Sequence, residues 1–141
     1  MRMITTLGAI AALTAAFTAH ADNAERHLLL LNSGSLQTQG MALVLGNAIA
    51  ERGHRVDVLL CDSAGDLALK DAAPAALEPL KASPVQLLGK LQQGGATVSV
   101  CALYLPNSPH DSNDLREGIT VATPPAIAER MTAADTRVHI F

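Results

Sequence analysis

A strand–helix–strand pattern near the start of the chain constrains the fold more than any other feature. The run His27–Leu31 is almost all leucine, which is typical of a strand buried on both faces of a parallel sheet. From Thr38 to Arg52, apolar residues recur every three or four positions, as on one face of a helix, and Gly53 is well placed to end it. A second apolar strand, Arg55–Leu60, follows. Two strands joined by a helix predict a right-handed βαβ unit.

The rest of the chain continues this alternation of strands and helices. Ser83-Pro84 and Thr123-Pro124 are each typical of a helix start, and they predict helices over residues 84–93 and 124–133. Three further strands are predicted at Thr97–Val100, Ile119–Val121 and Arg137–Phe141. We therefore expect an α/β fold, with a flavodoxin-like, doubly wound, mostly parallel five-stranded sheet in three α/β/α layers.

Length and composition indicate a single domain and argue against nucleic-acid binding. The 141 residues suit a single domain. Aromatic residues make up 2% of the chain and the net charge is −3, so a basic, base-stacking surface for nucleic acid is not expected. The sequence has no Walker A or GxGxxG motif, and no cofactor is predicted.

The first residues read as an export signal. Arg2 is followed by the apolar stretch Ile4–Phe17, and Ala19-His20-Ala21 fits a signal peptidase site. The stretch is shorter than the roughly 20 residues that cross a bilayer, although an uncleaved membrane-anchoring helix is the alternative. We expect a signal peptide over residues 1–21, one domain over residues 22–141, a periplasmic location and no membrane association after cleavage.

Both cysteines, Cys61 and Cys101, are expected at the carboxyl ends of strands, the edge where open α/β sheets bind ligands. An activated thiolate at Cys101 could attack a disulfide, carry a persulfide or bind a soft metal. A buried, inert cysteine is the alternative. Asp62 would raise the pKa of Cys61, which favours a structural or resolving role for that residue.

A disulfide between the two cysteines is not expected. In a flavodoxin-like strand order, the first strand lies between the second and the third. Two strand spacings would then separate the Cα atoms of Cys61 and Cys101 by about 9–10 Å, beyond the roughly 7 Å limit for a disulfide.

Other polar residues give weaker indications of a site. The loop Asn32–Thr38 precedes a helix and could hold an anion, but helix capping explains its hydroxyl groups better. The set Cys101, His110 and Asp111 lacks a recognised zinc spacing, so no metal site is predicted. His27 and His54 are expected at the surface.

Taken in order, seven segments resemble the DsrE/DsrF-like (TusD/YchN-like) family of small sulfur-relay proteins. The segments are Leu28–Leu31, Gly40–Leu43, Ala50–Val58, Gly65–Leu69, Gly94–Cys101, Leu115–Ile119 and Ala134–Phe141. The resemblance implies a flavodoxin-like domain that assembles into trimers or hexamers. It also implies that a cysteine at the end of the third strand carries a persulfide, and Cys101 occupies that position. The family's relay proteins are cytoplasmic, whereas this chain carries an apparent export signal.

These observations lead to one main hypothesis and two alternatives. The main hypothesis is an exported, sulfurtransferase-like carrier of sulfane sulfur in which Cys101 accepts the sulfur and His110 or Arg116 stabilises its thiolate. Its partners would be a sulfur donor or acceptor protein, or a small sulfur compound. The alternatives are a non-catalytic binding module for a small ligand or soft metal ion, and a structural subunit of an oligomer.

Overall fold

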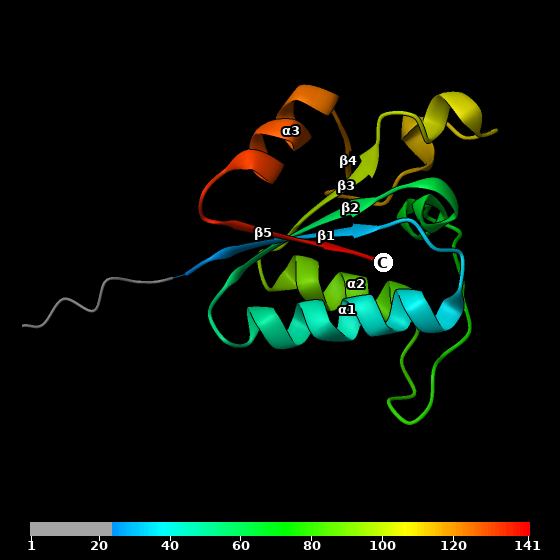
Figure 1. The fold of residues 1–141 in the computed structure, drawn as a ribbon. Coiled ribbons are helices and arrows are strands. Elements are labelled where there is room, and N and C mark those ends of the chain that lie inside the picture. Colours follow the sequence, from blue (N-terminus) through cyan, green and yellow to red (C-terminus); the bar gives the residue numbers. More distant parts are fainter. Residues whose placement is uncertain (1–23) are drawn as a thin grey trace, which may run out of the picture.

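A computed structural model describes residues 24–141, which form a parallel five-stranded sheet flanked by helices (Figure 1). The predicted signal peptide, residues 1–21, lies outside the described residues. The strands are β1 (Arg26–Leu31), β2 (Arg55–Leu60), β3 (Thr97–Cys101), β4 (Thr120–Ala122) and β5 (Thr136–Ile140). The helices are α1 (Leu36–Ala50), α2 (Pro84–Gln93) and α3 (Pro124–Thr132). The predicted α/β class with a mostly parallel five-stranded sheet is confirmed.

Helices α1 and α2 cover one face of the sheet and α3 lies on the other (Figure 1). The main core lies between the sheet and the α1–α2 layer, where Leu31, Leu60 and Val100 are completely buried. The side-chain amide of Asn47 in α1 donates hydrogen bonds to the carbonyl oxygens of Leu43 and Leu87. Because Leu87 belongs to α2, this amide ties the two helices together.

The helix starts follow from local capping. The Ser35 hydroxyl accepts a hydrogen bond from the backbone N–H of Thr38, so α1 begins at Leu36, two residues before the predicted start. Helix capping thus accounts for a hydroxyl group of the loop before α1. Ser83 and Gln86 form a reciprocal capping box at the start of α2, as the Ser-Pro pair predicts. The Thr123 side chain makes no such cap, although α3 begins at Pro124 as expected.

The strand order is β4-β3-β2-β1-β5, so β2 lies between β1 and β3. The sequence-based estimate of the distance between Cys61 and Cys101 assumed that β1 lies between β2 and β3, and this assumption is wrong. The connections β1–α1–β2 and β2–α2–β3 each move one strand along the sheet in the same direction. Right-handed crossovers in the same direction place their helices on the same face of the sheet, and α1 and α2 accordingly pack against each other. The connection from β4 back to β5 steps in the opposite direction, which places α3 on the other face.

No helix within residues 24–141 has both the length and the apolar character needed to cross a bilayer.

Candidate functional site

Cys61 and Cys101 lie opposite each other at the carboxyl edge of the sheet. Strand β2 pairs with β3 in a register that sets Leu60 against Val100, and each cysteine is the next residue along its strand. Neighbouring strands are about 4.8 Å apart, so the Cα atoms fall within the range that a disulfide can bridge. The predicted separation by an intervening strand is therefore wrong. Both cysteines are free thiols and both are partly exposed.

The two thiols influence each other. Burial is the largest cause that raises the pKa of the Cys61 thiol to about 12, and the neighbouring Cys101 and Asp62 add to the rise. Cys61 is therefore protonated at neutral pH. The prediction that Asp62 raises the pKa of Cys61 is confirmed, but desolvation is the larger cause.

A cleft with a volume of about 660 Å³ opens over this pair of cysteines. Asn32 at the end of β1, the loop after β2 and the loop after β3 supply its walls. The Tyr104 hydroxyl donates a 2.6 Å hydrogen bond to Asp66, which joins the two loops. Burial, followed by this hydrogen bond, raises the pKa of Tyr104. Gly65 lies under the Tyr104 ring, where a Cβ atom would come within 2.3 Å of a ring carbon.

The charge of the cleft is acidic. Asp62 and Asp66 line it, and no Lys, Arg or His does so among residues 24–141. A second, apolar hollow of about 280 Å³ lies on the α3 side of Cys101 and is walled by residues that include Leu59, Ile127 and Met131. Cys101 therefore lines both the acidic cleft and the apolar hollow.

The structure places His110 and Arg116 outside the lining of the cysteine cleft. The His110 ring has Nδ1 3.6 Å from an Asp114 carboxylate oxygen. The Arg116 guanidinium donates a 2.9 Å hydrogen bond to the carbonyl oxygen of Ala72. His110 thus contacts a residue of its own loop and Arg116 contacts the segment before α2, and their predicted action on the Cys101 thiolate stays a prediction.

Asp111 has a local structural contact. Its side chain accepts a 2.6 Å hydrogen bond from the backbone N–H of Asn113 and caps a short turn. Neither Asp111 nor His110 lines the cleft with Cys101.

A histidine cluster that the sequence did not predict lies at the opposite edge of the sheet. His27 is only 8% exposed, so the expectation that it lies at the surface is wrong, whereas His54 is half-buried. The alternation of side chains along a strand could have predicted the burial of His27, because His27 shares a sheet face with the core residues Leu29 and Leu31. The position of His54 beside it depends on the pairing of β1 with β2.

Comparisons with known proteins bear on the fold. No protein-family model matches the sequence, and no curated protein matches it. The crystal structure of the YchN protein from E. coli aligns with a TM-score of 0.71 at 18% identity, over 83% of this chain and 99% of that one. A protein of unknown function from Methanobacterium thermoautotrophicum, MTH1491, aligns with a TM-score of 0.63, also at 18% identity and over the same shares. The chain therefore shares its fold with YchN and MTH1491.

Proposed function

We propose that the protein is a carrier of sulfane sulfur and that Cys101 is the residue that accepts and hands on the sulfur atom. The observation that carries this proposal is the position of Cys101, which ends β3 and lines an open cleft with a second cysteine opposite it. The shared fold and the resemblance to sulfur-relay proteins support the same chemistry.

The transfer requires a thiolate and room for a sulfur chain. After the Cys101 proton passes to water, the thiolate attacks the terminal sulfur of a polysulfide and a new S–S bond forms. The old S–S bond breaks, and the shortened polysulfide leaves with the electron pair. An acceptor thiolate then attacks the outer sulfur of the persulfide, and Cys101 leaves as a thiolate. The cleft of about 660 Å³ has room for a small donor of this kind.

Cys61 is proposed as the resolving thiol. The Cys61 thiolate would attack the inner sulfur of the Cys101 persulfide and form a Cys61–Cys101 disulfide. The S–S bond of the persulfide breaks, and the outer sulfur leaves with the electron pair as hydrogen sulfide. The attack needs the Cys61 thiolate, and a pKa of about 12 keeps that form scarce at neutral pH. The persulfide should consequently survive long enough to meet an acceptor.

Mass spectrometry of the protein after incubation with polysulfide tests the proposal. Wild type should gain about 32 Da for each sulfur atom carried, and dithiothreitol should remove the gain. Cys101→Ser should show no gain, whereas Cys61→Ser, the matched control, should keep the gain and hold it longer. Equal labelling of wild type and Cys101→Ser would overturn the proposal.

A soft-metal carrier is the second candidate, because two thiols at neighbouring strand ends are suitable ligands for Cu(I). This candidate predicts stoichiometric uptake of Cu(I) that needs both cysteines. It also predicts no transfer of sulfur from polysulfide to an added thiol. A titration with a competing Cu(I) chelator, run beside the mass measurement, distinguishes the two functions.

The proposed setting is the bacterial periplasm, after removal of residues 1–21. N-terminal sequencing of the protein recovered from a periplasmic extract should begin at Asp22. A full-length protein in the cytoplasmic fraction would contradict export.

We also propose that the protein assembles as a homo-oligomer, either a trimer or a hexamer. Leu103 and Met131 are exposed beside the apolar hollow at Cys101, and their burial in a subunit interface would be favourable. Light scattering during size-exclusion chromatography measures the number of subunits, and a monomer at all concentrations would exclude assembly.

A further inference from the structure

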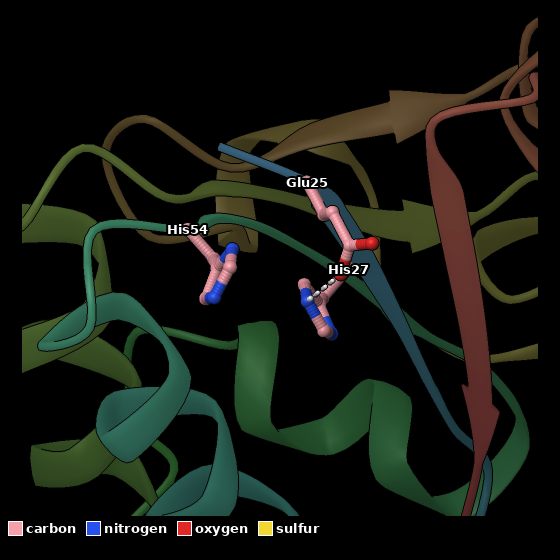
Figure 2. A group of neighbouring side chains, drawn as sticks. All are labelled: Glu25, His27 and His54. Atoms are coloured by element: carbon pink, nitrogen blue, oxygen red, sulfur yellow. Dashed lines mark ion pairs between the residues drawn. The ribbon is translucent and has the colours of Figure 1, made fainter. Parts of the chain in front are cut away.

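Four side chains meet at the amino edge of the sheet, at the end of β1 and β2 away from the cysteines. Glu25 precedes β1, His27 lies within β1, His54 precedes β2, and His139 lies in β5. One ligand atom from each of Glu25, His27 and His54 lies within 4.8 Å of the other two. Figure 2 shows these three side chains directed toward a common space between the start of β1 and the turn before β2.

Two nitrogen atoms in this cluster are buried and have no hydrogen-bond partner among residues 24–141. They are Nε2 of His27 and Nδ1 of His54. His27 is more than nine-tenths buried, so solvent does not readily supply the missing partner. Buried polar atoms in folded proteins nearly always have partners, and an exception requires an explanation such as a bound ion. Two such nitrogens on adjacent rings, with a carboxylate beside them, are the donor set of a metal site.

The other ring nitrogen of His27 is already engaged. Its Nδ1 lies 3.0 Å from Nε2 of His139, and the two rings are stacked. When His27 Nδ1–H donates to His139, the lone pair of His27 Nε2 is free and faces the cluster. Metal-binding histidines commonly have this arrangement, because a hydrogen bond from the second nitrogen sets the tautomer and the orientation of the ring.

Glu25 is oriented in a similar way. Its Oε1 atom accepts a 2.6 Å hydrogen bond from the Arg137 guanidinium. The second carboxylate oxygen, Oε2, lies 3.9 Å from Nε2 of His27 (Figure 2). Arg137 thus holds one oxygen of the carboxylate while the other points into the cluster.

The spacing suits a small transition-metal ion. Ligand atoms in a tetrahedral zinc site lie about 3.4 Å from one another, given metal–ligand distances near 2.1 Å. Nε2 of His27 and Oε2 of Glu25 are 3.9 Å apart, and one ligand atom from each of the three residues lies within 4.8 Å of the others, so shifts of about an ångström would bring them to this spacing. His54 follows Gly53, whose φ of +86° ends the turn after α1, so His54 lies in a connecting segment outside any strand or helix.

We propose that Glu25, His27 and His54 bind a divalent transition-metal ion, for which Zn²⁺ is the best match, and that His139 is a positioning residue for His27. Imidazole nitrogen and carboxylate oxygen are ligands that Zn²⁺ accepts, and three protein ligands leave a fourth position for water or another small ligand. This site is independent of the proposed sulfur chemistry, because it lies at the opposite edge of the sheet.

Isothermal titration with Zn²⁺ tests the site, with the thiols removed as competing ligands. The background is the full chain with Cys61→Ser and Cys101→Ser, and its circular dichroism spectrum should match that of wild type. We expect about one Zn²⁺ ion per chain. His54→Gln and Glu25→Gln should each weaken binding by about tenfold or more, and His139→Phe should weaken it by about 10–100-fold. His110→Gln is the matched control, since that histidine lies outside the cluster, and it should bind like the background.

Co²⁺ provides a second readout that does not depend on mutation of His27, the most buried ligand. Absorption bands of tetrahedral Co²⁺ should appear in the background protein and vanish on addition of excess Zn²⁺. The proposal is overturned if the thiol-free protein binds neither ion, or if His54→Gln, Glu25→Gln and His110→Gln all bind equally.

Discussion

Cys61 and Cys101 lie opposite each other at the ends of neighbouring parallel strands, and both line one cleft. The arrangement results from the position of β2 between β1 and β3. It makes the pair a dithiol, in which the reaction of either sulfur affects the other.

Oxidation should therefore link the two cysteines within one chain. Treatment with diamide is expected to form a Cys61–Cys101 disulfide, because the strand spacing of about 4.8 Å suits the bond. Non-reducing gel electrophoresis and peptide mapping measure the product. Cys61→Ser should show no internal disulfide under the same conditions. Linkage exclusively between chains would contradict the opposed arrangement.

Alkylation should distinguish the two thiols. At pH 8, iodoacetamide is expected to modify Cys101 well before Cys61, because a thiol with a pKa of about 12 contains very little thiolate. The rate at Cys61 should rise about tenfold for each pH unit, since the thiolate fraction does so below the pKa. Peptide mapping at several pH values measures both rates. In urea-unfolded protein the two rates should converge, and faster labelling of Cys61 in the folded protein would contradict the prediction.

Stability should fall at alkaline pH because of the same thiol. The folded-state pKa of Cys61, about 12, lies above the ordinary value near 8.5, so the unfolded chain loses this proton first as pH rises. The stabilising contribution is complete below about pH 8.5 and is lost progressively up to about pH 12. Urea unfolding at pH 7 and pH 10 should show a smaller loss for Cys61→Ser than for wild type. Equal losses in the two proteins would contradict this assignment.

Tyr104 should stabilise the cleft. Tyr104→Phe removes the 2.6 Å hydrogen bond to Asp66 and is expected to lower the free energy of unfolding by about 1 kcal/mol. Gly65→Ala should cost more, about 1–3 kcal/mol, because the new Cβ atom would overlap the Tyr104 ring. Urea denaturation measures both. Gly89→Ala is the control, since nothing lies within 4 Å of the Cβ position at Gly89.

If the methyl group of Gly65→Ala displaces the Tyr104 ring and breaks its hydrogen bond to Asp66, the double variant Gly65→Ala/Tyr104→Phe should be non-additive with the two single variants. Because Phe keeps the ring, strict additivity would show that the hydrogen bond survives beside the new methyl group.

The sequence by itself determined the local elements of this protein and their order along the chain. Leucine runs, helical periodicity and Ser/Thr-Pro pairs are short-range signals, and they predicted β2 and α2 at their observed bounds. They also placed Cys61 and Cys101 at strand ends, because a strand end is a property of one segment. Each of these features depends on interactions among residues that are close in sequence.

Only the tertiary structure decided which of those segments are neighbours. The order of the strands depends on how α1 and α2 pack over one face, and no single segment encodes that packing. The adjacency of the two cysteines follows from it. So does the cluster of His27, His54 and His139, whose members are as many as 112 residues apart in sequence and meet through the pairing of β1 with β2 and β5. A site built from side chains on different strands, such as the cysteine pair or the histidine cluster, can be identified only when the pairing of those strands is known.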